Sequence, residues 1–121
     1  KALVFGVEIF DNKYMLRGTN YVWIFIYYIF VVSICEEFFY REYVQGELEA
    51  ILGKARFLAP LIAAACFGYV HIVNCFRETV YLTFLIGLVL GYAKMYIKNC
   101  TFISVIIAHG LYDFLIVLTG W

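Results

Sequence analysis

Charged residues are scarce in this sequence, and neither sign of charge is in excess. Only 15% of the 121 residues are charged, whereas a soluble domain carries about 25%. Nine basic and nine acidic side chains give a formal net charge of zero. A chain without a basic excess cannot neutralise a phosphate backbone, so we do not expect nucleic acid as a partner.

Familiar metal and redox motifs are missing as well. No H-E-x-x-H pair occurs, so no familiar zinc spacing is present. No C-x-x-C pair occurs either, which argues against a zinc ribbon or a thioredoxin-like site. We expect free thiols that pack as small hydrophobic side chains at the four cysteines, Cys35, Cys66, Cys75 and Cys100.

Apolar side chains are abundant. The sequence is 65% hydrophobic and 21% aromatic, with a mean hydropathy of +0.89, whereas soluble domains are about 45–50% apolar. Tyr and Trp favour membrane interfaces. The length permits one domain. The chain opens with Lys1 and shows no signal peptide, so we expect a processed product or part of a longer polytopic protein.

The apolar pattern predicts an all-α fold, a polytopic membrane helix bundle with about four transmembrane helices in an up-down arrangement. Residues 1–20 hold too short an apolar run to span a bilayer. We expect an interfacial lead-in there, or the end of a missing helix, and a core over residues 21–120. The expected spans are Tyr21–Gln45 with Gly46 as its stop, Pro60–Cys75, Thr79–Lys98 and Thr101–Leu118, with residues 46–58 as an interfacial connector.

Gly87 and Gly91 in the third expected span form a G-x-x-x-G pattern. This pattern lets helices approach closely in membranes, and it is also frequent by chance.

Ionisable residues from three expected spans fall at one depth. At a rise of 1.5 Å per residue, Glu36 lies about 13 Å from the end of the first span and His71 about 16 Å from the start of the second. His109 lies about 12 Å from the start of the fourth, on the same membrane side. An ionised side chain at a helix centre costs about 2.5–3.5 kcal/mol, so such residues normally pair with one another and mark function.

Spacing within the helices suggests partners for these groups. Glu37 and Arg41 are four residues apart and can pair, which indicates a structural role. His109 and Asp113 have the same spacing, so the carboxylate can orient the imidazole.

Two mechanisms remain open for this cluster. In one, Glu36 is a general base for a water that His71 holds, with His109 and Asp113 near the oxyanion. In the other, His71 and His109, together with Glu36 or Asp113, bind Zn²⁺ and a water that the metal activates.

Three short motifs follow one another on successive apolar helices. Residues 36–41 read E-E-x-x-x-R, Phe67–His71 reads F-x-x-x-H, and His109–Asp113 reads H-x-x-x-D. In this order they resemble the CPBP family, which includes type II CAAX prenyl endopeptidases and bacteriocin-processing or immunity proteins and is also called the Abi family. The resemblance covers about residues 20–118.

The resemblance implies an intramembrane glutamate endopeptidase that needs no cofactor. Glu36 would activate water, His71 would assist it, and His109 with Asp113 would stabilise the oxyanion. Glu37, Arg41 and Phe67 would support the site. An ionised Asp cannot donate to an oxyanion, so Asp113 must be protonated, orient His109 or bind a metal.

The expected substrate is a membrane-associated peptide or protein, with lipidated chains as one class. The expected location is a multi-pass position in a bilayer, of which the bacterial plasma membrane is our prediction. The alternatives are a non-proteolytic membrane binding or immunity protein of the same fold, a zinc-dependent intramembrane protease, and an ion or proton pathway.

Overall fold

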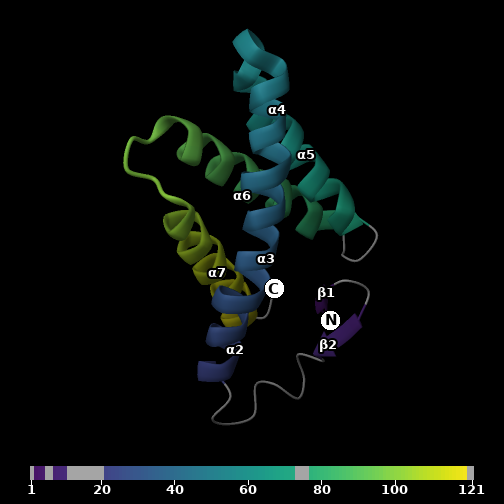
Figure 1. Cartoon of the computed structure of the whole chain (residues 1–121). Helices are drawn as coiled ribbons and strands as arrows, with labels where there is room; N and C mark the ends of the chain where they lie inside the picture. The colour runs from purple at the N-terminus through teal and green to yellow at the C-terminus, as the bar shows by residue number, and fades with distance from the viewer. Residues whose placement is uncertain (1, 5–6, 11–20, 73–76, 120–121) are drawn as a thin grey trace.

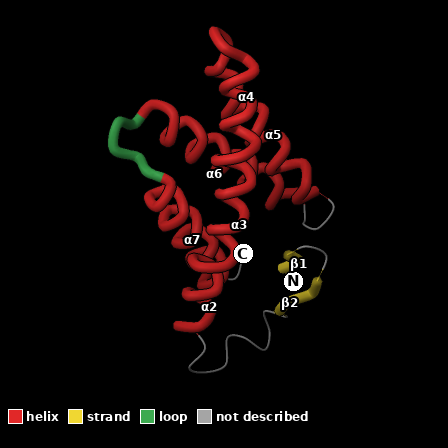
Figure 2. The backbone as a smooth tube through the Cα atoms, viewed as in Figure 1, coloured by secondary structure: helices red, strands yellow, loops and turns green. Residues whose placement is uncertain are grey.

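The computed structural model describes residues 2–4, 7–10, 21–72 and 77–119. Apart from a short hairpin near the N-terminus, these residues form helices and the turns that join them (Figure 2). The predicted all-α class is therefore confirmed for the main body of the chain.

The described part of the first twenty residues consists of two short strands. β1 (Ala2–Val4) pairs antiparallel with β2 (Val7–Phe10), with Leu3 opposite Glu8. The structure thus has a hairpin here and not the end of a helix. Val, Ile and Phe fit a pleated surface, which favours strands in this run. The interfacial location and the boundary at residue 20 stay predictions.

A long helix begins at Tyr21 and continues to Leu52 (Figure 1). Two of its stretches are π-helical, with wider turns than an α-helix. Its successive segments are α2 (Tyr21–Tyr27), the π-helix η1 (Tyr28–Ser33), α3 (Ile34–Glu37), the π-helix η2 (Phe38–Val44) and α4 (Gln45–Leu52).

The predicted stop of this helix at Gly46 is wrong. Gly46 lies inside α4, and the chain turns instead at Gly53, whose φ is +53°. This left-handed conformation is costly for residues with a Cβ atom, so a glycine suits this turn. At Gly46 the backbone stays helical, because a glycine permits a turn without imposing one.

Three further helices complete the chain. The 3₁₀-helix η3 (Gly53–Leu58) leads into α5 (Ala59–Ile72), which returns beside the long helix (Figure 1). The predicted end of this span at Cys75 lies outside the described residues. α6 (Arg77–Tyr96) begins at Arg77 and not at Thr79, and α7 (Phe102–Thr119) follows closely where the fourth span was predicted.

The glycines of α6 lie against α5. A Cβ atom on Gly87 would stand 3.0 Å from Phe67 Cδ1, and one on Gly91 would stand 3.0 Å from Pro60 Cβ. Phe67 is itself buried, with a relative exposure of 1%. The G-x-x-x-G pattern therefore brings two helices together, as predicted.

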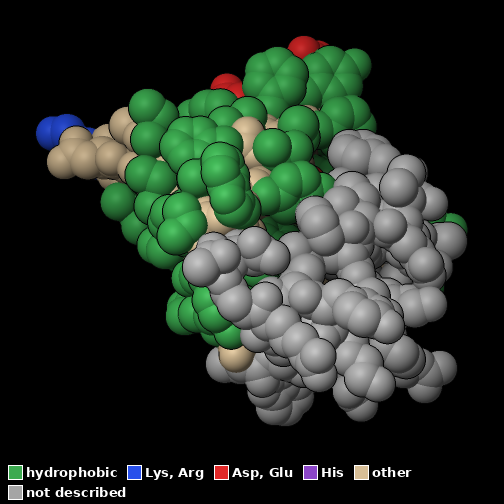
Figure 3. All heavy atoms as spheres, turned by 90° about the horizontal axis from the view of Figure 1, so that it is seen from below, with side chains coloured by type: hydrophobic (Ala, Val, Ile, Leu, Met, Phe, Trp, Pro, Cys, Tyr) green, Lys and Arg blue, Asp and Glu red, His purple; other side chains and the backbone are tan. Residues whose placement is uncertain are grey.

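Membrane-spanning character is clearest in the first half of the chain. Among the described residues, one continuous helical segment, Tyr21–Ile72, is long and apolar enough to cross a bilayer. The apolar helical stretches Val80–Tyr96 and Phe102–Leu118 are shorter. Large apolar side chains point outward, and the described part of the face in Figure 3 is mostly hydrophobic. The predicted total of four spans stays a prediction.

Gly110 on α7 provides a test of how tightly the long helix packs there. A Cβ atom at this position would lie 2.5 Å from Ile29 Cγ1 and 2.9 Å from Ile29 Cα, which is backbone and cannot rotate away. We expect Gly110→Ala to lower the free energy of unfolding by about 1–3 kcal/mol. Thermal unfolding in detergent measures the change.

Gly46→Ala is the matched control. An added Cβ there meets nothing within 4 Å. Because alanine favours a helix interior, this variant should be as stable as the wild type or slightly more stable. Equal unfolding temperatures for both variants would contradict the close packing at Gly110.

Candidate active site

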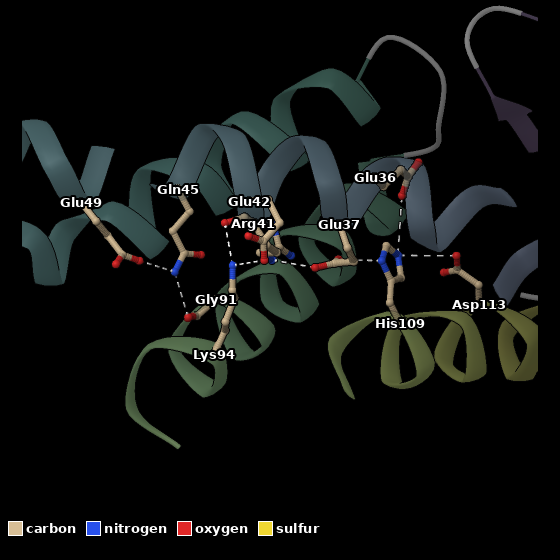
Figure 4. Close-up of polar contacts among 10 residues, drawn as sticks. All are labelled: Glu36, Glu37, Arg41, Glu42, Gln45, Glu49, Gly91, Lys94, His109 and Asp113. Atoms are coloured by element: carbon tan, nitrogen blue, oxygen red, sulfur yellow. Dashed lines mark hydrogen bonds and ion pairs between the residues drawn. The ribbon is translucent and has the colours of Figure 1, made fainter. Parts of the chain in front are cut away.

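Acidic and imidazole groups from three helices meet between the long helix, α5 and α7. Glu36 Oε1 lies 4.0 Å from His71 Nε2, and Glu36 Oε2 lies 3.6 Å from His109 Nε2. Asp113 Oδ2 lies 3.5 Å from the same nitrogen of His109 (Figure 4). The structure therefore brings together the four residues that the sequence singled out as catalytic candidates.

Adjacent positions on α3 give the two glutamates different partners. Neighbouring residues of a helix project about 100° apart. Glu36 faces the Nε2 atoms of both histidines, whereas Glu37 faces the other side of the His109 ring. One turn of helix thus presents two carboxylates to the same imidazole.

Glu37 is the hydrogen-bond partner of His109. His109 Nδ1 donates to Glu37 Oε1 over 2.7 Å, with side-chain exposures of 3% and 1%. The spacing of His109 and Asp113 had suggested that Asp113 orients the ring. The structure places Asp113 near Nε2, the nitrogen that Glu36 also faces. This role of Glu37 has no signal in the spacing, because the bond joins α3 to α7.

Arg41 balances the charge of Glu37, as the spacing predicted. Arg41 Nε lies 3.1 Å from Glu37 Oε2, and both side chains are almost fully buried. Its guanidinium carbon also lies 5.4 Å from the centre of the Phe67 ring. Glu37 consequently joins a buried cation on its own helix to an imidazole on α7.

Phe67 and His71 share one turn of α5. The Phe67 ring centre lies 4.8 Å from that of His71 and 5.7 Å from that of His109, in edge-to-face arrangements. His71 Nδ1 donates to the Phe67 carbonyl over 2.8 Å. In a neutral imidazole this leaves Nε2 as an acceptor, and that atom faces Glu36.

The capacity for a metal ion is limited in this arrangement. Within the described ranges, no group of three or more His, Cys, Asp or Glu side chains is arranged to hold one. The zinc set predicted from His71, His109 and a carboxylate stays a prediction. Cys35, Cys66 and Cys100 are free thiols, and Cys75 lies outside the described residues.

Comparison with known proteins gives one match. The family model described as "type II CAAX prenyl endopeptidase Rce1-like" matches residues 18–115, which include every residue discussed in this section. No curated protein and no solved structure matches the chain.

The buried pair of Glu37 and Arg41 leads to a prediction on stability. Glu37→Gln should lower the free energy of unfolding by about 3–5 kcal/mol, because it leaves a buried guanidinium without its counter-charge. Thermal or denaturant unfolding in detergent measures the loss.

Glu36→Gln serves as the comparison for that variant. Glu36 keeps 16% side-chain exposure and lies 3.6 Å or more from either histidine nitrogen. We expect its unfolding transition to stay within about 1 kcal/mol of the wild type. Equal losses in both variants would show that Glu37 has no special part in stability.

Proposed function

The chain belongs to the type II CAAX prenyl endopeptidase Rce1-like family, and from this we propose that it is an intramembrane endopeptidase in which Glu36 activates the attacking water. The observation that carries the proposal is the position of Glu36. Its two carboxylate oxygens face the Nε2 atoms of two histidines from different helices, over 4.0 and 3.6 Å.

These separations suit a water between the groups. They exceed a direct hydrogen bond, and a polar contact of this length is commonly bridged by a water molecule. A water held by Glu36 and by the acceptor nitrogen of His71 would have both of its protons directed away from a peptide carbonyl. Its oxygen lone pair is then free to attack the carbonyl carbon.

The proposed reaction balances around one proton. Glu36 takes a proton from water as the oxygen bonds to the carbonyl carbon, and the carbonyl oxygen becomes an oxyanion. The carbon–nitrogen bond then breaks, and protonated Glu36 gives its proton to the leaving amine. The products are a carboxylic acid and an amine, and Glu36 is again a carboxylate.

His109 is the proposed oxyanion donor. Because its Nδ1–H is bonded to Glu37, it can present an N–H at Nε2 only as the doubly protonated ring. Glu36, Glu37 and Asp113 place carboxylate oxygens within 3.6 Å of its two nitrogens and balance such a cation. Fixed charge at a buried oxyanion site is effective because it needs no reorganisation during the reaction.

Exposure indicates the side from which a substrate would enter. The side chains of His71, Asp113 and Glu36 keep 23%, 19% and 16% exposure, whereas His109 and Glu37 keep 3% and 1%. A peptide therefore approaches the face that Glu36, His71 and Asp113 line. We propose a membrane-associated peptide as substrate, with prenylated C-terminal peptides as the first class to test.

Glu36→Gln tests the role of the base. We expect cleavage to fall by about 10²–10⁴-fold, because the amide cannot take the proton from water. The assay uses purified chain in liposomes with a peptide library, in prenylated and unprenylated versions, and mass spectrometry of the products.

Glu47→Gln is the control, since Glu47 is an exposed residue of α4 away from the described contacts. It should cleave as the wild type does. Full activity of Glu36→Gln would remove Glu36 from the role of base. A wild-type chain that binds peptides and cleaves none would favour the non-proteolytic binding protein instead.

Chelators separate the water mechanism from the zinc mechanism. If Glu36 and the histidines act without a metal, EDTA and phenanthroline leave the cleavage rate within about twofold of the untreated protein. A loss of activity that added Zn²⁺ restores would support the metal route through His71 and His109.

A further inference from the structure

We propose that Lys94 of α6 is a positioning residue for the site, because it holds the π-helical segment η2 in the register that keeps Glu37 on His109. The inference rests on the proposed function, and it concerns a residue outside the three motifs. Lys94 contacts two consecutive residues of η2, and neither contact involves a catalytic group (Figure 4).

The first contact depends on the backbone pattern of η2. In an α-helix the Arg41 carbonyl would accept from the N–H of Gln45, four residues on. Here the Gln45 N–H donates to the Tyr40 carbonyl, five residues back, as in a π-turn. The Arg41 carbonyl accepts a hydrogen bond from Lys94 Nζ over 3.1 Å.

The second contact is an ion pair with the next residue. Lys94 Nζ also bonds Glu42 Oε1, so one ammonium group holds a carbonyl and a carboxylate from adjacent positions. Both side chains are partly exposed, with 23% for Lys94 and 40% for Glu42. An exposed pair of this kind contributes little to global stability, so its loss should leave the fold intact.

Arg41 transmits the position of η2 to the site. Its Nη1 and Nη2 atoms have no hydrogen-bond partner within the described part of the chain. The guanidinium is placed instead by the Glu37 ion pair, by the Phe67 ring and by Gly87, where a Cβ atom would lie 3.4 Å from Nη2. Its location therefore depends on where the backbone of residue 41 is held.

The next residue of the row is fixed in the same way. Gln45 Nε2 donates to the Gly91 carbonyl of α6 over 3.2 Å and to Glu49 over 2.8 Å. A Cβ atom on Gly91 would stand 3.0 Å from Gln45 Oε1. α6 thus approaches η2 and α4 too closely for a slipped register to be tolerated, and Lys94 lies one turn beyond this contact.

Lys94→Met tests the inference in the full-length chain in liposomes. We expect kcat to fall about tenfold with KM within about twofold of the wild type, because small misplacements of catalytic groups cost rate. Lys94→Arg should restore most of the activity, since a guanidinium can reach both acceptors. Lys98→Met, at an exposed residue of the turn after α6, is the control and should behave as the wild type.

Glu42→Gln completes a double-mutant cycle. If Lys94 acts through η2, the Glu42→Gln/Lys94→Met variant loses no more activity than Lys94→Met alone. Additive losses would show that the two residues act separately and would overturn the inference.

A spectroscopic readout keeps this test independent of peptidase activity. The chain has two histidines, so the His109 ring is readily assigned in ¹⁵N-histidine-labelled protein. Lys94→Met should shift the Nδ1 proton that bonds Glu37, whereas Lys98→Met should not. An unchanged resonance together with unchanged kcat overturns the inference. If no peptide is cleaved by the wild type, the proposed function fails and the resonance alone decides the role of Lys94.

Discussion

The arrangement depends on the need to neutralise one buried carboxylate. Glu37 has no exposed surface, and a charge in that position is costly unless it is paired and hydrogen-bonded. Arg41 supplies the opposite charge from the same helix, and His109 supplies a hydrogen bond from α7. The two contacts tie the long helix to α7 at the level of the site, so the charge is compatible with the fold only when the site is assembled.

Close helix packing supports this polar centre. The small residues of α6 allow α5 to bring Phe67 against the guanidinium of Arg41 and the rings of both histidines. An aromatic ring there excludes water from Arg41 while offering its face to the cation. The glycines of α6 therefore serve the polar residues of the long helix as well as apolar packing.

Much of the site could be predicted from the sequence because it depends on helical spacing. The depth of Glu36, His71 and His109 follows from a constant rise per residue, and the pairing of Glu37 with Arg41 follows from their separation. The bond between Glu37 and His109 could not be predicted, since it depends on how two distant helices face each other.

Local backbone choices were also beyond the sequence. Gly46 and Gly53 are both glycines near a plausible helix end, and only the tertiary arrangement decides which one turns the chain. The π-turns have no compositional signature either. They lengthen the helical period, so that Glu37, Arg41, Gln45 and Glu49 stay on one face although four residues of an α-helix advance by about 40° beyond a full turn.

The π-helical form of η2 also restricts how this chain can change in length. A π-turn carries more residues per turn than an α-turn, so removing one residue between Phe38 and Val44 would let the backbone return to ordinary α-helical bonding. The helix would remain, yet everything before the deletion would rotate by about 100° relative to α4. Glu36 and Glu37 would then face new neighbours. Descendants of this sequence can therefore exchange side chains along η2 far more freely than they can gain or lose a residue within it.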